Sequence, residues 1–208
     1  MPPRTTPARA TPATARAVTD LRQQTLDAAR RLVGERGYRD VSMRDIANEV
    51  GCSVSSLYLH FESRDALIHT LIDEGYERWY REMIAVAERH PEAWARLEAI
   101  ARRYVAFGQE QPELYEIMYM FNPRSMKRLP RELFRRIRAH FHPWSETVLA
   151  CGVPEQEATV VATAVWAALH GAVSTLLTQR LDTRIERDGF VEAAIALAVA
   201  SVRTAAAR

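Results

Sequence analysis

The chain has 208 residues, of which 48% are hydrophobic and 26% charged, and its formal net charge is +2. This balance is typical of a soluble globular protein, and it excludes collagen-like and low-complexity chains. The two cysteines lie far apart in the sequence, which excludes a disulfide scaffold and favours a reducing, cytoplasmic location.

In chain order, residues 1–17 come first, and their four prolines and lack of acidic residues predict a disordered basic tail. The rest of the chain shows apolar residues at three- and four-residue steps and no alternation with the period of a strand. The sequence therefore predicts an all-α protein of about nine helices. They are expected over residues 18–36, 43–50, 54–60, 64–89, 91–110, 113–121, 131–150 with a kink or break at Pro143, 155–181 and 189–205.

Residues 41–67 predict two short helices joined by a tight turn. Ala47 is small enough for a close approach of the helices, and Gly51 can adopt the positive φ that such a turn requires. In a helix-turn-helix unit the second helix enters the major groove, where hydroxyls contact phosphates or bases and a valine packs on a thymine methyl. The candidate DNA-binding residues are Ser42, Met43, Arg44, Ser53, Val54, Ser55, Ser56, Tyr58, His60 and Arg64.

Residues 20–67 resemble the DNA-binding domain of TetR-family transcriptional regulators. The matching features are Gly37-Tyr38, Val41-Ser42-Met43, Ile46-Ala47, Val50-Gly51-Cys52-Ser53, Leu57-Tyr58, His60-Phe61 and Ser63-Arg64-Asp65-Ala66-Leu67. The resemblance implies a helix-turn-helix domain over residues 18–65 and an effector-binding and dimerisation domain over residues 66–208. It also implies a homodimer on a near-palindromic double-stranded DNA operator, more often a repressor than an activator. Val54 departs from the family, because many members have Lys or Arg at this position.

Residues 158–179 contain no charged side chain, so a membrane-spanning helix has to be considered. Several threonines, His170 and many weakly hydrophobic alanines argue against it, and no second segment of this kind is expected. We therefore predict no membrane association. A helix that is apolar on all sides can pack on its own domain and on a partner subunit, and together with residues 189–205 it would form a four-helix dimer interface.

Trp166, His170 and Gly171 resemble the signature of the Trp-His-Gly (WHG) subfamily of TetR regulators. The resemblance implies a pocket for a small apolar effector, and Met and aromatic side chains suit such a pocket. The same residues are also what a plain hydrophobic core contains, and His170 is better explained as a buried, hydrogen-bonded histidine that joins two helices than as a ligand contact. The candidate ligand-binding residues are Phe107, Tyr115, Met118, Tyr119, Phe141, Trp144, Trp166 and His170.

The sequence shows no catalytic constellation, and we expect no cofactor, no metal site and no enzymatic activity. The basic run 124–138 is explained either by phosphate contacts or by a solvated helix face. The predicted function is a repressor that its effector releases from DNA. The alternative is an all-α small-molecule-binding protein or enzyme that has lost sequence-specific DNA binding, which the uncharged residues 54–56 would favour.

Overall fold

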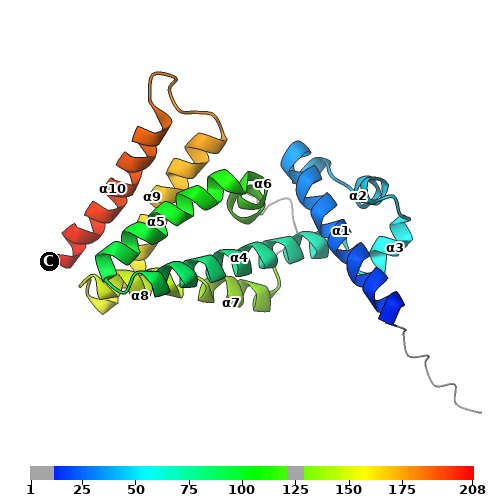
Figure 1. The fold of residues 1–208 in the computed structure, drawn as a ribbon, viewed down its shortest axis with the longest axis horizontal. Helices are drawn as coiled ribbons and strands as arrows, with labels where there is room; N and C mark the ends of the chain where they lie inside the picture. Colours follow the sequence, from blue (N-terminus) through cyan, green and yellow to red (C-terminus); the bar gives the residue numbers. More distant parts are fainter. Residues whose placement is uncertain (1–11, 121–128) are drawn as a thin grey trace, which may run out of the picture. The chain divides into compact units, whose positions relative to one another are not determined.

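The computed structural model describes residues 12–120 and 129–208, and these form helices and no strand. The predicted all-α fold is therefore confirmed (Figure 1). The chain divides into two compact units, and the boundary lies between Ile68 and His69. Helix α4 (Arg64–Arg89) begins in the first unit and continues in the second.

The first unit contains α1 (Pro12–Arg36), the 3-10 turn η1 (Tyr38–Asp40), α2 (Met43–Val50), α3 (Val54–Tyr58) and the start of α4. Leu26, Leu32, Ile46, Leu57 and Leu67 are all buried and come from every helix of the unit. They make one small core, in which the apolar stripe of α1 packs on α2, and α2 packs on α3.

The predicted disordered tail is too long by its last six residues. Residues 12–17 belong to α1, which starts six residues earlier than the sequence predicts. Alanine is the best helix former, and Ala13, Ala15 and Ala17 fall in this stretch, so local propensity outweighs the cost of a proline in the first turn. Residues 1–11, which carry Arg4 and Arg9, lie outside the described part of the chain.

The second unit has longer helices. The first ones after α4 are α5 (Ala93–Glu110), α6 (Pro112–Tyr115) and a π-helical turn, η2 (Glu116–Met120). They are followed by α7 (Arg131–Ala139), α8 (His142–Ala150), α9 (Glu155–Leu177) and α10 (Arg187–Ala206).

The break predicted in the segment 131–150 is present, but it lies slightly before Pro143 and divides the segment into two helices. They meet at His140 and Phe141, and Pro143 lies in the first turn of α8, where its missing N–H costs nothing. Pro91 also differs from the expectation, because it precedes α5 instead of opening it. The Glu92 carboxylate caps that helix by accepting hydrogen bonds from the N–H groups of Trp94 and Ala95, at 3.0 and 2.6 Å.

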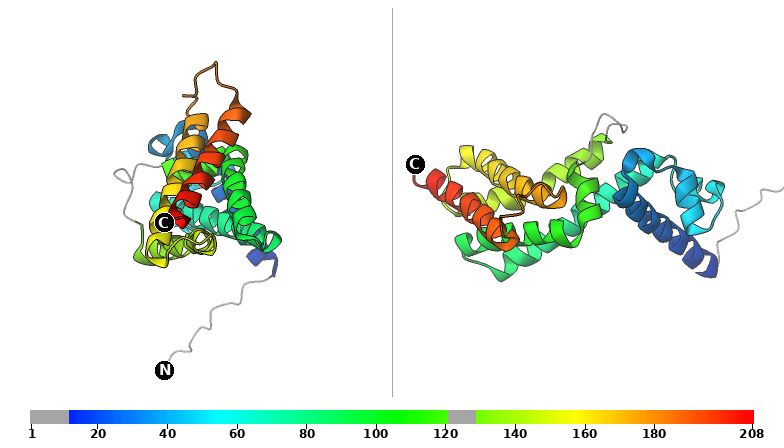
Figure 2. Two further views of the ribbon diagram at one scale, coloured as in Figure 1. Left: turned by 90° about the vertical axis from the view of Figure 1, so that its left-hand side faces the viewer. Right: turned by 90° about the horizontal axis from the view of Figure 1, so that it is seen from above.

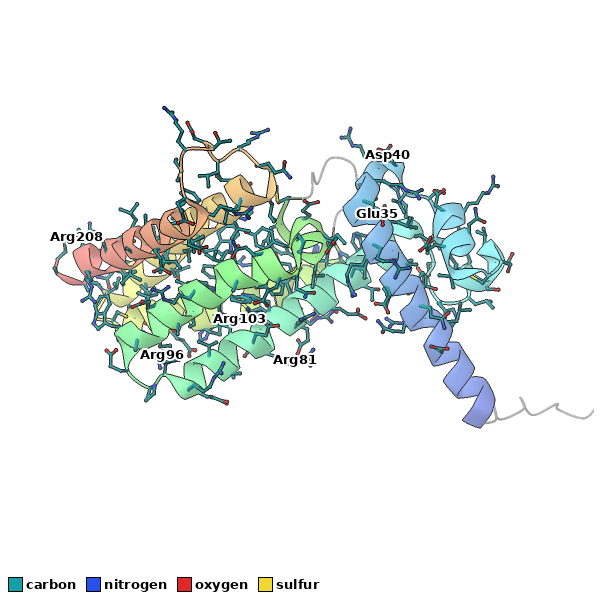
Figure 3. The ribbon with its side chains drawn as sticks, turned by 45° about the horizontal axis from the view of Figure 1, so that its top comes forward. Glu35, Asp40, Arg81, Arg96, Arg103 and Arg208 are labelled. Carbon is teal, nitrogen blue, oxygen red and sulfur yellow. The ribbon has the colours of Figure 1, made fainter. Side chains whose placement is uncertain are left out.

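Side chains fill the space between the helices of the second unit (Figure 3). The buried core there is rich in aromatic residues, which come from α4, α5, α6 and α8. Tyr104 is in edge-on contact with Trp79 and Trp144, at ring-centroid distances of 5.4 and 6.0 Å. Two glycines allow helices to approach closely. A Cβ on Gly108 would lie 2.4 Å from Val173 Cγ1, and one on Gly75 would lie 2.6 Å from Met118 Sδ.

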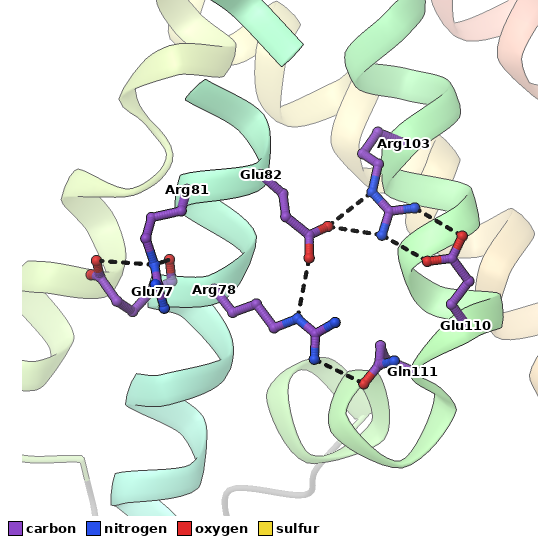
Figure 4. Close-up of polar contacts among 7 residues, drawn as sticks. All are labelled: Glu77, Arg78, Arg81, Glu82, Arg103, Glu110 and Gln111. Atoms are coloured by element: carbon purple, nitrogen blue, oxygen red, sulfur yellow. Dashed lines mark hydrogen bonds and ion pairs between the residues drawn. The ribbon is translucent and has the colours of Figure 1, made fainter. Parts of the chain in front are cut away.

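A polar network joins α4 to α5 on one side of this core (Figure 4). The Arg103 guanidinium lies between the carboxylates of Glu82 and Glu110, with N–O distances of 2.8 Å to each. Arg78 donates to Glu82 and to Gln111, both at 3.1 Å. Hydrogen bonds from Arg103 lower the pKa of the Glu110 carboxyl. The network fixes the position of α4 along α5 and at the start of α6.

Helices α9 and α10 lie side by side (Figures 1 and 2), and both pack on α5, while α9 also packs on α8. By length and composition both are apolar enough to cross a membrane, so the expectation of no second such segment is wrong. Core helices of soluble proteins pass the same test. In the apolar windows 33% of α9 and 22% of α10 is buried within the unit. Each helix therefore keeps a large apolar surface that the described chain does not cover.

Candidate nucleic-acid interface and ligand cavity

The turn between α2 and α3 has the geometry that the sequence predicts. Gly51 adopts φ 77° and ψ 33°, and its N–H donates to the Ala47 carbonyl at 2.9 Å. The Cys52 N–H donates to the same carbonyl at 3.0 Å. A residue with a Cβ is strained in this left-handed region, so glycine is what allows the chain to reverse here.

Ser42 and Ser53 cap the two short helices. The Ser42 Oγ accepts from the Asp45 N–H at 3.2 Å, and the Asp45 carboxylate accepts from the Ser42 N–H at 2.8 Å. The Ser53 Oγ accepts from the Ser56 N–H at 3.1 Å. Hydrogen bonds from Ser42 lower the pKa of the Asp45 carboxyl. The carboxylate therefore stays ionised at the start of α2, where it offsets part of the attraction of that helix terminus for phosphate.

Most of the predicted DNA-binding side chains lie at least partly on the surface of this unit. Ser42, Arg44, Ser53, Ser55 and Tyr58 are exposed. Val54, Ser56 and His60 are half-buried. Arg44 is the exposed cation of α2, and it has no ion pair in the part of the chain that the structure describes.

Met43 and Arg64 are placed differently from the prediction. Met43 is only 6% exposed and belongs to the core, which leaves its backbone N–H as the group available to a phosphate. The Arg64 guanidinium donates to the Val41 carbonyl at 3.0 Å and lies over the Tyr38 ring, 4.1 Å from its centroid. Tyr38 in turn donates to the Asp65 carboxylate. Arg64 therefore has a structural role, because it holds the start of α4 to the loop before α2.

The second unit contains a cavity of about 260 Å³. Helix α4 contributes to its wall, together with η2, α7, α8, α9 and the junction between α7 and α8. Its described lining residues are Tyr76, Trp79, Tyr119, Ile137, Arg138, His140, Phe141, Trp144, Thr163 and Trp166.

Four of the eight predicted ligand-binding residues line this cavity, namely Tyr119, Phe141, Trp144 and Trp166. Phe107, Tyr115, Met118 and His170 do not line it. Phe107 and Tyr115 are fully buried, and Met118 packs beside Gly75. A ligand contact by these four residues stays a prediction.

His170 has the geometry of a structural histidine. Its Nδ1 lies 2.7 Å from the Tyr115 hydroxyl, which lies 3.0 Å from the Tyr104 hydroxyl. The imidazole also stacks on Trp166, with a centroid distance of 5.2 Å and an interplanar angle of 14°. Burial lowers the pKa of His170, which favours the neutral ring. These hydrogen bonds connect α9, which carries Trp166, to Tyr115 on α6 and Tyr104 on α5.

The sequence prediction missed the contribution of α4 to the cavity. Tyr76 and Trp79 are three residues apart and therefore share one face of that helix, a signal that the sequence contains. Arg138 and His140 carry no local signal of this kind. Arg138 belongs to the last turn of α7, and His140 reaches the cavity because that helix ends at Ala139 and the chain turns there.

Comparisons with known proteins agree with both units. The model of a family described as "Bacterial regulatory proteins, tetR family" matches residues 26–71. A model described as "Tetracyclin repressor-like, C-terminal domain" matches residues 97–198. Neither description mentions the WHG subfamily, so that finer assignment stays a prediction.

Among curated proteins, the nucleoid occlusion factor SlmA of Aliivibrio fischeri is 26% identical over 117 residues, which are 54% of this chain and 60% of SlmA. The HTH-type transcriptional repressor KstR2 of Rhodococcus jostii is 37% identical over 68 residues, which are 31% of this chain and 33% of KstR2. The match thus spans less than two thirds of SlmA and about a third of KstR2.

Solved structures match over most of the chain. A protein of unknown function from Rhodococcus sp. RHA1 is 25% identical, with a TM-score of 0.73 over 89% of this chain and 95% of that one. A TetR-like transcriptional regulator from the same source is 18% identical and has the same fold, with a TM-score of 0.66 over 94% of this chain and 97% of that one. With both domain models matched in order, this chain belongs to the TetR family of bacterial regulatory proteins.

Proposed function

We propose that the protein is a cytoplasmic, homodimeric transcriptional repressor that a small, largely apolar effector releases from a near-palindromic DNA operator. The observation that carries the proposal is α3, a short helix whose first turn lies at the surface of a unit fixed by the Gly51 turn and the Ser53 cap. A helix held this way can enter a major groove without rearrangement.

The chemistry of α3 favours base and backbone contacts through hydroxyl groups. Ser55 and the Tyr58 hydroxyl are exposed donors and acceptors, and Val54 offers methyl groups. None of the residues Val54–Tyr58 is charged, so a phosphate contact beside α3 has to come from another element, such as the exposed Arg44 on α2. We therefore expect few phosphate contacts from this unit and a modest dependence of affinity on salt.

The uncovered apolar faces of α9 and α10 support a homodimer. Val160, Ala164, Ala167 and Gly171 are exposed and recur along α9 at three- and four-residue steps. Leu197 is 71% exposed on the neighbouring helix. Apart from its chain neighbours and the backbone of α9 itself, no atom of the described chain lies within 4 Å of a Cβ built on Gly171, so a partner helix can approach closely there. A second copy would bury both stripes in a four-helix interface.

Helix α4 offers a route from effector to DNA. Tyr76 and Trp79 line the cavity, and Arg64 at the start of the same helix binds the loop before α2. We propose that the effector stabilises one position of α4. In that position the spacing of the two DNA-binding domains of the dimer no longer matches the spacing of the operator half-sites.

The test is fluorescence anisotropy of a DNA fragment taken from upstream of the protein's own gene, against a shuffled fragment of the same composition and length, at physiological salt. We expect the native fragment to bind at least a hundredfold more tightly. Ser55→Glu should abolish that preference because it places a carboxylate against the DNA. Thr183→Glu, which makes the same charge change in the exposed loop before α10, should not.

Equal affinity for the two fragments would overturn the proposal. That result, combined with ligand binding in the cavity, would instead favour a small-molecule-binding protein that no longer reads DNA. We expect no catalytic turnover in either case.

A further inference from the structure

We propose that the cavity of the second unit takes a compact aromatic anion, an aryl carboxylate of one or two rings, with the rings among Trp79, Trp144 and Trp166 and the carboxylate on Arg138. The inference rests on the proposed function in treating the cavity as the effector site, and it adds the chemical class of the effector.

The wall of the cavity is predominantly aromatic. Six of its ten described lining residues are Trp, Tyr or Phe. Neighbouring rings contact each other, since Tyr119 lies 5.9 Å from Trp166 and 5.4 Å from Tyr76. Phe141 meets Trp166 edge-on, at 6.5 Å and 86°. Such a wall offers flat faces and ring edges in fixed positions, which favours a planar guest over a flexible acyl chain.

The size of the cavity limits the guest. An apolar cavity of roughly 150 Å³ in another protein holds one benzene molecule. The present cavity, at about 260 Å³, is therefore large enough for two fused rings but too small for most drug-sized ligands.

The charge on the cavity wall comes from Arg138. Its neighbours on α7 are already paired, since Arg135 contacts Glu132 and Arg136 contacts Asp73, each at 2.5 Å. No ion pair or hydrogen bond of the Arg138 side chain is found within the described chain, although Arg138 lines the cavity. None of the described lining residues is acidic. A cationic aromatic guest would therefore meet a like charge, whereas a carboxylate would accept two parallel hydrogen bonds from the guanidinium.

His140 adds a neutral polar edge to the same wall. It stacks on Tyr80 at 4.7 Å, and its Nε2 lies 3.5 Å from a Glu77 carboxylate oxygen. Burial lowers the pKa of His140, against the opposing effects of Glu77 and Asp73. With the His140 imidazole neutral, the Arg138 guanidinium is the positive charge among the described lining residues that can bind an anion.

The experiment uses the full-length protein without DNA. Three of its four tryptophans line the cavity, so a bound aromatic guest should change their fluorescence. The probes are 2-naphthoate, its neutral analogue 2-naphthamide, and decanoate, an anion without a ring. We expect saturable quenching by 2-naphthoate, and at least tenfold weaker binding of the other two by calorimetry.

Two variants locate the site. Arg138→Met should weaken 2-naphthoate about tenfold, to the level of 2-naphthamide, while the amide is unaffected. Arg135→Met, on the same helix but away from the cavity lining, is the matched control and should change neither. Ile137→Trp should fill the cavity and abolish binding of both aromatic probes, and an unchanged circular dichroism spectrum would show that it still folds.

Equal affinities for 2-naphthoate and 2-naphthamide, or an unchanged affinity in Arg138→Met, would overturn the anion assignment. Tighter binding of decanoate would overturn the aromatic assignment. Since neither measurement involves DNA, failure here is separate from failure of the operator test. If the protein prefers its operator but binds none of the probes, only the assignment of the effector class is refuted. If it binds 2-naphthoate but shows no preference for the operator, only the repressor function is refuted.

Discussion

The two units of this chain are held together in different ways. In the first, helices as short as α3 depend on local devices: side-chain caps, the left-handed Gly51 and the tie from Arg64 to Val41. In the second, long helices pack through a large aromatic core that leaves a cavity on one side and bare apolar stripes on another. The first arrangement suits a rigid DNA-binding surface. The second suits binding of a small-molecule ligand in the cavity and of a second subunit on the apolar stripes. Substitutions can weaken each unit separately, and we expect the largest effect in the aromatic core of the second.

Gly108→Leu tests whether the core of the second unit depends on close helix contact. The new side chain would overlap Val173 on α9, and we expect a loss of about 3 kcal/mol in unfolding free energy. Gln109→Leu, which places the same side chain at the neighbouring exposed position of α5, is the matched control. Urea denaturation at low protein concentration would measure both. A Gly108→Leu variant as stable as the parent protein would refute the close contact.

Arg64→Met tests whether this residue stabilises the first unit or binds phosphate. We expect a loss of about 2 kcal/mol, since the Val41 and Tyr38 carbonyls lose a charged donor. The slope of log affinity against log salt should stay unchanged. Arg44→Gln should do the reverse, leaving stability intact and lowering that slope by about 1. A reduced slope in Arg64→Met would restore the phosphate role that the sequence suggests.

Ser53→Ala removes the cap of α3 and should cost about 1 kcal/mol. Thermal unfolding would show this as a lower midpoint, and Ser55→Ala, which removes an exposed hydroxyl with no capping role, serves as its control. Equal midpoints for the two variants would mean that α3 is fixed by packing of Leu57 alone.

His170→Gln tests the buried hydroxyl chain through pH. Burial lowers the pKa of His170 in the folded protein, so below about pH 6.5 the unfolded chain binds the extra proton first. Stability therefore falls as the pH drops below about 6.5, and this contribution is fully present above it. Tyr115 and Tyr119, which face the ring, stay neutral in this range because burial raises the pKa of each. The variant should lose part of the difference in urea midpoint between pH 7.5 and 5.5. The loss should stay below about 1 kcal/mol because solvent reaches part of the ring.

The same contrast explains which features the sequence predicts correctly. Capping by Ser42 and Ser53 and the turn at Gly51 involve residues three to five positions apart, so their signal is local and the structure agrees with it. The cavity combines residues as far apart as Tyr76 and Trp166, and only half of the predicted ligand set lines it. For Arg64 the residue type alone predicts the wrong role. Its charge suggests a phosphate partner, yet its guanidinium donates hydrogen bonds to carbonyls more than 20 residues away in the chain.

The π-helical turn Glu116–Met120 has a consequence for how the cavity can change. A π turn holds one residue more than an α turn, so it acts as a single-residue insertion within a helix. Deleting one residue within this turn would return it to α-helical geometry. If the deleted residue is Tyr119, the cavity loses one of its six aromatic lining side chains, while the identity of the other lining residues stays the same. Loss of one codon can thus remove a lining ring and convert the π turn to an α turn in a single step.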